Sequence, residues 1–216
     1  MKIPKDGVFV IGAGGHSKVV ISTLQAVGYN VKCILDDDKN LWGKYILGHK
    51  IEGPVSELSD IEQNVKAVIA IGNNAIRKKI AESFHHLEWI NAIHPDTTIH
   101  PTVKIGKGTV IFAGSVIQPD TKIGNHCIIN TSSSVDHDCE IKDFVHVAPG
   151  CHLAGGINLD EGSFLGIGCK LIPGVTLGKW ATCGAGSVVI KDIPDHKTVV
   201  GIPAKEIHKK SKNEVS

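Results

Sequence analysis

The sequence predicts two parts, an α/β domain at the front and a parallel β-helix behind it. Two observations predict this division. A glycine-rich turn, Gly12 to Gly15, directly follows a short apolar run, and from Ile93 onward an aliphatic residue returns at every sixth position. Aromatic residues are scarce whereas glycine occurs 24 times, which favours a narrow repetitive architecture over a core of large side chains.

The six-residue repeat runs from Ile93 to Val189, and Cys183 is its single departure from a branched aliphatic residue. A second row, four residues further on, runs from Thr97 to Ile193 and holds small or β-branched residues. Each hexad therefore predicts one short strand and one turn. Three hexads close a triangular coil, and such coils stack at strand spacing, about 4.8 Å.

Glycine and cysteine fit this repeat. Glycine and asparagine at turn sites, namely Gly106, Gly108, Gly124 and Asn125, suit left-handed backbone. Four of the six cysteines occupy the small inward row, where they act as compact buried hydrophobes. No C-x-x-C pair occurs in the sequence, so we predict no metal site.

The front part reads as alternating strands and helices. Apolar runs predict strands at 7–11, 30–35 and 65–71, and apolar periodicity predicts helices at 17–28 and 75–87, the second one basic at Arg77, Lys78 and Lys79. We therefore predict a Rossmann-like domain over residues 1–90, the β-helix over 91–205 and a polar tail over 206–216.

The glycine turn predicts a phosphate site. Backbone N–H groups at Gly14 and Gly15 can approach a phosphate at the start of a helix, and an acid after the second strand can bind ribose hydroxyls. Ser17 stands where the dinucleotide fingerprint has its third glycine, and the domain is short. These features favour a mononucleotide group over NAD. The alternative is a turn that serves only strand-to-helix packing.

Composition limits the partners. Lys plus Arg number 23 against 22 for Asp plus Glu, so nothing indicates a nucleic-acid or membrane surface. The first apolar run, Val8 to Ile11, is too short for a signal peptide or a membrane span. We expect a cytoplasmic protein with reduced thiols.

Both parts resemble known families. The hexads resemble the hexapeptide-repeat transferases, whose solenoid is left-handed. Gly12-Ala-Gly-Gly-His16, Asp36-Asp37 and Ile71-Gly-Asn-Asn74 resemble the bacterial nucleotide-sugar N-acetyltransferases that modify a 4-amino sugar, and the similar sialic acid O-acetyltransferases. The resemblance implies a trimer with active sites between subunits. It also implies that acetyl-CoA binds to the solenoid and that the nucleotide-sugar binds at Gly14, Gly15, His16, Asp36, Asp37 and Gly72.

The resemblance also implies the catalytic groups. Acetyl transfer to an amine needs a base, and histidine suits that role near neutral pH. Residues 130–139 resemble the family's active-site segment, so His137 is the expected general base and Asp138 the acid that raises its basicity. The implied acetyl-CoA contacts are His146, Ile167 and Ala185, with a backbone N–H of Gly155 near the thioester. We interpret His152 as structural or at an interface.

We therefore predict an acetyl-CoA-dependent N-acetyltransferase of bacterial glycan biosynthesis that acts on the 4-amino group of a nucleotide-linked sugar, with UDP favoured. Three alternatives stay open. A sialic acid O-acetyltransferase shares the motifs. A metalloenzyme of the γ-carbonic anhydrase type uses a similar prism, although it gives the glycine turn no role. A non-catalytic scaffold would bind no CoA.

Overall fold

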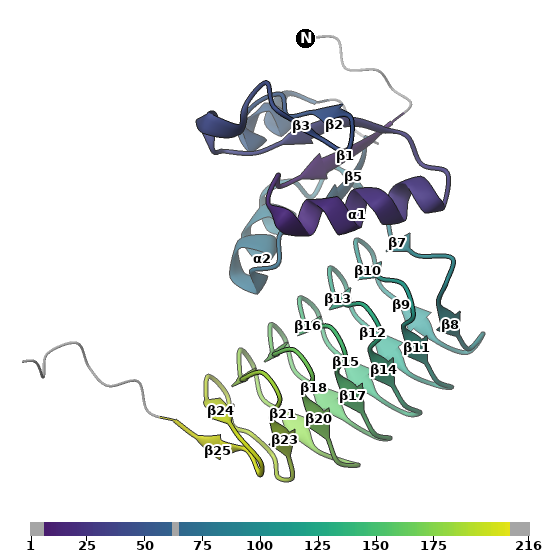
Figure 1. The fold of residues 1–216 in the computed structure, drawn as a ribbon, viewed down its shortest axis with the longest axis vertical. Coiled ribbons are helices and arrows are strands. Elements are labelled where there is room, and N and C mark those ends of the chain that lie inside the picture. Colours follow the sequence, from purple (N-terminus) through teal and green to yellow (C-terminus); the bar gives the residue numbers. More distant parts are fainter. Residues whose placement is uncertain (1–6, 62–64, 208–216) are drawn as a thin grey trace, which may run out of the picture.

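The computed structural model describes residues 7–61 and 65–207. A small α/β domain sits on one side of a long triangular prism (Figure 1). The front domain contains β1 (Val8–Ile11), α1 (Gly15–Ala26), β2 (Val31–Leu35), η1 (Lys39–Leu41), β3 (Tyr45–Ile46), β4 (His49–Lys50), η2 (Val55–Asp60), β5 (Lys66–Ile69), α2 (Asn74–Ser83) and β6 (Glu88–Trp89).

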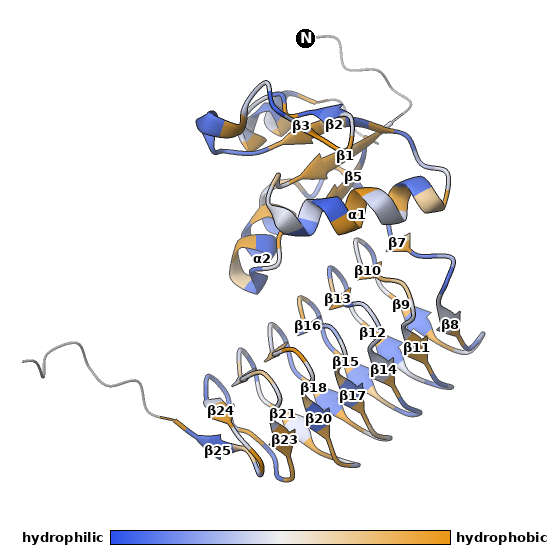
Figure 2. Cartoon of the chain, in the orientation of Figure 1, coloured by the Kyte–Doolittle hydropathy of each residue, from blue (hydrophilic) through white to orange (hydrophobic). Residues whose placement is uncertain are grey.

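The front sheet is parallel, with strand order β2-β1-β5-β6. Its central strand β1 is fully buried, which explains its continuous apolar run, and Figure 2 shows it in hydrophobic colours. The sequence prediction places the strands and helices in the correct order. It begins helix α1 two residues late, and it misses the fourth strand β6 and the β3–β4 hairpin, because these pieces are too short to show a periodicity.

The prism consists of three parallel sheets. The first contains β7 (Ala92–Ile93), β10 (Val110–Ile111), β13 (Ile128–Ile129), β16 (His146–Val147), β19 (Phe164–Leu165), β22 (Thr182–Cys183), β24 (Thr198–Val200) and, antiparallel at its end, β25 (Lys205–Glu206). The second contains β8 (Thr98–Ile99), β11 (Val116–Ile117), β14 (Ser134–Val135), β17 (His152–Leu153), β20 (Lys170–Leu171) and β23 (Val188–Val189). The third contains β9 (Lys104–Ile105), β12 (Lys122–Ile123), β15 (Glu140–Ile141), β18 (Asn158–Leu159) and β21 (Thr176–Leu177). We call these the C, D and E faces.

Both rows of the hexad point into the prism, as predicted. From Ile111 to Val189 the aliphatic row is buried, and so is the small row from Thr109 to Ser187. Inward-facing Cys127, Cys139, Cys151 and Cys169 are free thiols. Strands pair with partners eighteen residues away, as Ile111 does with Ile129. The fold is thus a parallel β-solenoid of the left-handed β-helix type.

The glycines at the corners of the prism differ in part from the sequence prediction. A left-handed residue recurs every sixth position, from Gly108 onward, and most of the non-glycine examples are polar. Gly106, Gly124 and Asn125 are not left-handed, so that part of the prediction is wrong. Gly106 and Gly124 serve close coil stacking instead, because a Cβ would lie 2.6 Å from the Gly124 carbonyl carbon and 2.3 Å from Asp143 Oδ1, respectively.

The final coil is two residues shorter than the others. Cys183 pairs with Val199, and Ile193 bridges to Leu177, each sixteen residues away. Ile193 therefore continues the aliphatic row, whereas the sequence prediction had placed it in the small row. Glu206 lies in β25, so the tail begins later than predicted; residues 208–216 lie outside the described residues.

The two halves share a hydrophobic core. Outward-facing Val110 and Ile128 of the C face pack with Val20, Ile21 and Leu24 of α1. This contact fixes the front domain over the C face, so the ends of β1 and β5 lie above the prism (Figure 1). Within the described residues, no helix is long and apolar enough to cross a membrane.

Candidate active site

The edge between the D and E faces carries the predicted base and its acid. His137 and Asp138 lie in the turn from β14 to β15, and the left-handed backbone of Asp138, with φ of 57°, bends the chain there. Nδ1 of His137 lies 2.8 Å from Oδ2 of Asp138. Both side chains are exposed, at 61% and 67% of their surface, so the imidazole is accessible to a substrate.

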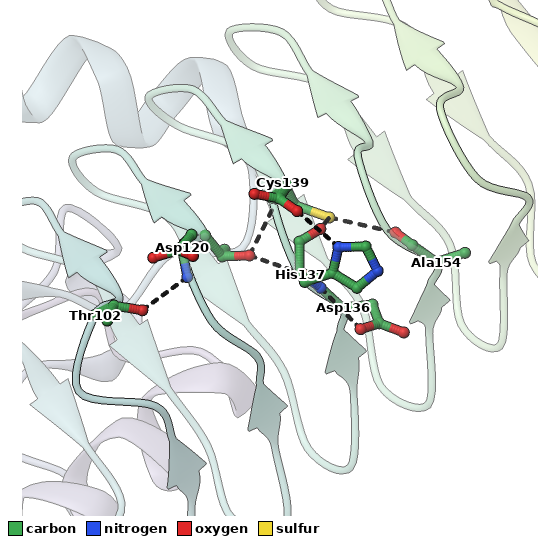
Figure 3. Close-up of polar contacts among 8 residues, drawn as sticks. Thr102, Asp120, Asp136, His137, Cys139 and Ala154 are labelled. Carbon is green, nitrogen blue, oxygen red and sulfur yellow. Dashed lines mark hydrogen bonds and ion pairs between the residues drawn. The ribbon is translucent and has the colours of Figure 1, made fainter.

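The turn holds the imidazole in place. The backbone N–H of His137 donates to Oδ1 of Asp136, and its carbonyl accepts from the N–H of Gly156 on the next coil. Figure 3 shows the ring reaching toward the coil that carries Ala154. Gly155 follows Ala154, and a Cβ there would lie 2.6 Å from Nε2 of His137. The missing side chain at Gly155 thus makes room for the imidazole.

The acid raises the basicity of the histidine. The hydrogen bond to Asp138 raises the pKa of His137 above its ordinary value, and the negative charges of Asp136 and Asp138 act in the same direction. When Nδ1–H donates to the carboxylate, Nε2 is left as the free acceptor. The pair can therefore remove a proton from a group that approaches Nε2.

The glycine turn forms an open helix start. Gly14 is the N-cap of α1 without a side-chain cap, and a Cβ at Gly14 or Gly15 would meet nothing within 4 Å. Gly12 differs, because its φ is 105° and a Cβ there would lie 2.6 Å from the Ile71 side chain. Gly12 therefore shapes the turn, whereas Gly14 and Gly15 leave space beside free helix N–H groups, where an anion can bind.

The two acids after β2 hold the backbone around this turn. Oδ2 of Asp36 accepts from the N–H of Ala13 at 2.7 Å, and its Oδ1 accepts from the N–H of Asp38. Asp37 accepts from the N–H of Val55. Asp36 thus joins the ends of β1 and β2, a supporting role that the sequence does not reveal. The ribose contacts of both acids stay a prediction.

Three predicted binding residues from separate sequence segments, His16, Gly72 and His146, meet between the two halves of the molecule. Nδ1 of His146 lies 3.2 Å from the Gly72 carbonyl, and the ring centroids of His16 and His146 lie 6.2 Å apart. Asn130 completes the group through Nδ2, 3.3 Å from Nε2 of His146. Burial, followed by the charge of Arg77, lowers the pKa of His16 to about 4 and that of His146 to about 3. Both rings are therefore neutral at physiological pH.

A cavity of about 340 Å³ opens beside this group. The first turn of α2 forms one wall, and Phe164, Trp180 and Thr182 of the prism form the other. The lining residues carry no charged side chain: Gly72, Asn73, Asn74, Ala75, Gly162, Phe164, Trp180 and Thr182. The sequence analysis missed the two aromatic residues, since a lone ring in a hexad carries no motif.

The predicted cofactor residues lie in different places. Gly155 lies beside His137 on the D–E edge, whereas Ile167 and Ala185 lie in turns on the edge between the C and D faces. Ile167 is 62% exposed, which suits contact with a ligand or a second chain. His146 is 8% exposed on the C face under the front domain. One chain therefore does not bring these four residues into a single groove.

Comparison with known proteins agrees with this fold. The PglD N-terminal domain model matches residues 7–84, and the bacterial transferase hexapeptide model matches residues 102–135. A structure of a histidine-to-asparagine variant of perosamine N-acetyltransferase from Caulobacter crescentus, with CoA and GDP-perosamine, is 37% identical, with a TM-score of 0.89 over 97% of this chain and 100% of that one. The chain belongs to the hexapeptide-repeat sugar N-acetyltransferases.

Other members of the family show similar agreement. The acetyltransferase domain of PglB from Neisseria gonorrhoeae, in complex with acetyl coenzyme A, is 37% identical, with a TM-score of 0.87 over 94% of this chain and 100% of that one. UDP-N-acetylbacillosamine N-acetyltransferase of Bacillus subtilis is 40% identical over 113 residues, or 49% of this chain and 51% of that protein. The chain thus spans about half the length of this curated relative.

Metal binding requires several ligating side chains close together. Among residues 7–61 and 65–207, no group of three or more His, Cys, Asp or Glu side chains could hold a metal ion. The thiols of Cys127, Cys139, Cys151 and Cys169 donate to carbonyl oxygens inside the prism, as Cys151 does to Gly166.

Proposed function

We propose that the protein transfers the acetyl group of acetyl-CoA to the 4-amino group of a nucleotide-linked sugar. The observation that carries this proposal is the His137–Asp138 pair, 2.8 Å apart on an exposed edge, with Nε2 free beside Gly155. Support comes from relatives of known chemistry, whose structures hold CoA with GDP-perosamine or acetyl coenzyme A alone.

In the proposed reaction, the amine nitrogen attacks the thioester carbonyl carbon while Nε2 of His137 accepts the amine proton. Collapse of the tetrahedral intermediate breaks the carbon–sulfur bond, and the proton passes from the imidazolium to the departing thiolate. Asp138 stabilises the imidazolium and holds the tautomer. We assign a backbone N–H at Gly155 to the oxyanion, because such a donor stabilises the negatively charged intermediate more than it stabilises the thioester ground state.

The acceptor is assigned to the front domain. Phosphates would bind at the open start of α1 beside Gly14 and Gly15, and the ribose beside Asp36 and Asp37. The sugar would then pass Gly72, near His16, toward the uncharged cavity that contains Trp180. A cavity with aromatic walls and no charge suits a neutral sugar ring better than a diphosphate.

The positions of the site residues favour assembly of several chains. His137 lies on the D–E edge, whereas the front domain covers the C face and Ile167 lies on the C–D edge. In a trimer, residues that lie far apart within one chain can meet at the contact between two chains. We propose that each active site takes His137 from one chain and the nucleotide-sugar from its neighbour.

A substrate panel tests the proposal. The protein would be incubated with acetyl-CoA and with UDP-, GDP- or dTDP-linked 4-amino sugars or CMP-sialic acid, and products would be analysed by mass spectrometry. We expect an N-acetylated sugar nucleotide, with UDP favoured, and at least a ~100-fold loss of kcat in His137→Ala. Esterified sialic acid would indicate the O-acetyltransferase. Absence of acetyl-CoA binding would contradict the whole assignment.

A further inference from the structure

Helix α2 carries a buried charge that the proposed reaction does not use. The sequence shows three consecutive basic residues there, but the structure separates them. Arg77 is 1% exposed, Lys78 pairs with Glu161 on the prism, and Lys79 is exposed. A buried guanidinium normally requires a carboxylate partner. Among the described residues, no acid forms an ion pair with Arg77, and backbone carbonyls surround it instead.

The N–H groups of the Arg77 guanidinium reach acceptors in both halves of the molecule. Nε donates to the His126 carbonyl at 2.7 Å, and Nη2 donates to the Phe144 carbonyl at 2.8 Å, both on the prism. Nη1 donates to the carbonyls of Ile71 and Gly72, at 3.1 and 3.3 Å. The carbonyls that stabilise the positive charge belong to two separate parts of the chain, the loop after β5 and the edge of the prism. Arg77 therefore connects that loop to the prism.

Asn74 strengthens the same connection. Its Oδ1 accepts from Nη2 of Arg77 at 2.8 Å, and its Nδ2 donates to the carbonyls of Gly162 and Ser163 at 3.0 and 3.1 Å. The pair therefore spans three successive coils, at residues 126, 144–145 and 162–163. Asn74 also lines the cavity, so this network sets the position of the cavity wall.

The network continues to His146, which is buried under the front domain. The Gly72 carbonyl, which accepts from Arg77, also lies 3.2 Å from Nδ1 of His146. A carbonyl only accepts, so Nδ1 of His146 carries the proton and Nε2 is the acceptor, facing Nδ2 of Asn130 at 3.3 Å. The position of Gly72 thus determines the tautomer of His146.

We propose that Arg77 is a positioning residue for the acceptor site. It holds Gly72 against the prism and so fixes the cavity wall and the orientation and tautomer of His146. This inference rests on the proposed function only for the identity of the acceptor. Arg77 touches no reacting atom, and it acts through Gly72 and Asn74.

The charge of Arg77 supports the same role. Burial contributes most to the low pKa of His146, and the nearby guanidinium contributes next. The titratable groups that face His146 are His16 from α1 and Arg77 from α2. An uncharged side chain at position 77 would remove one reason for His146 to stay neutral, and it would leave the Gly72 carbonyl free to move.

The test compares Arg77→Met and Arg77→Lys with Lys79→Met, a matched change of an exposed cation on the same helix. A misplacement of about 1 Å can reduce rate by about 100-fold. We expect kcat/KM for the nucleotide-sugar to fall about 10- to 100-fold in Arg77→Met, with a clearly smaller change in KM for acetyl-CoA. Arg77→Lys should recover part of the loss, because one ammonium reaches fewer carbonyls.

A second measurement does not depend on turnover. Histidine ring resonances would be followed by NMR against pH, with His146→Gln used to assign the His146 signals. In Arg77→Met we expect His146 to titrate at higher pH and to exchange tautomers, and in Lys79→Met to behave as in the unchanged protein. Should Arg77→Met fail to fold, Asn74→Ala and Arg77→Lys carry both measurements.

The outcomes separate the two proposals. If the unchanged protein acetylates no nucleotide-sugar, the proposed function fails while the titration of His146 still tests the role of Arg77. The inference is overturned if His146 titrates identically in Arg77→Met, or if both substrates lose affinity equally.

Discussion

The imidazole of His137 lies over the backbone of Gly155 on the next coil, so closely that a Cβ at Gly155 would be 2.6 Å from both Cε1 and Nε2. Real carbon atoms do not approach an aromatic ring at this distance. The glycine is therefore a condition for the position of the base, in addition to its proposed contact with the oxyanion.

Gly155→Ala tests this relationship. The new methyl group should displace the ring from its place beside Asp138, and we expect kcat to fall about 100-fold while the prism stays folded. Gly156→Ala is the control, because a Cβ there meets nothing within 4 Å although its φ is +69°. That variant should lose about 1–2 kcal/mol of stability and keep its turnover. Equal kcat values would contradict the steric argument.

Asp138→Asn tests the pH dependence. The hydrogen bond to Asp138 raises the pKa of His137, and the base works only when it is deprotonated, so activity in the unchanged protein falls as pH drops through this raised value. Without the carboxylate the pKa decreases, so the acidic limb of the kcat/KM profile should shift to lower pH. The plateau should also fall, because a weaker base accepts the proton less readily. If the acidic limb does not shift in Asp138→Asn, the limb reports the ionisation of a group other than His137.

Gly14→Val tests the phosphate site. Because a Cβ at Gly14 points into open space, the variant should fold normally and block only the ligand. We expect KM for the nucleotide-sugar to rise at least ~10-fold, or about 1.4 kcal/mol, with KM for acetyl-CoA unchanged. Gly12→Ala should instead lower the melting temperature, because its backbone is left-handed and its side chain would meet Ile71. A loss of stability in Gly14→Val would contradict this distinction.

Acid should loosen the front domain from the prism. His16, His126 and His146 have pKa values lowered to about 4, 4 and 3, chiefly by burial. In the unfolded chain these histidines bind protons near pH 6.5, whereas in the folded protein they stay neutral until the pH is much lower. The free energy of unfolding therefore falls as pH decreases from about 6.5 toward 4. The limiting slope is about 1.4 kcal/mol per pH unit for each histidine.

Hydrogen exchange measures this effect. After correction for intrinsic rates, the amides of α1 and α2 should lose protection between pH 7 and pH 5, more than those of the central coils. His146→Gln should reduce the loss, whereas His152→Gln should leave it unchanged because His152 is exposed on the D face. Equal loss of protection in both halves would exclude the histidines as its cause.

Several sequence inferences depended on local rules. The inward rows hold because a six-residue period puts the same side of every strand into one narrow core, as the burial of Ile129 and Cys127 shows. The short last coil could not be predicted, because isoleucine fits both the aliphatic and the small row. Only the bridge from Ile193 to Leu177 shows that Ile193 belongs to the aliphatic row. Asp36 is predicted to bind ribose, and its observed bond to Ala13 adds a role in the turn that no spacing could reveal.

The sequence by itself determined the repeat, the inward rows and the glycine turn, because each depends on neighbours in the chain or on one fixed period. The roles of His137 and Asp138 came from the resemblance of residues 130–139 to a family segment. Only the tertiary structure decided what the front domain contacts. Arg77 reads as one of three basic surface residues, yet it is buried against carbonyls of residues 71, 72, 126 and 144. Every residue has a backbone carbonyl, so a hydrogen bond from a side chain to distant carbonyls leaves no pattern in the sequence.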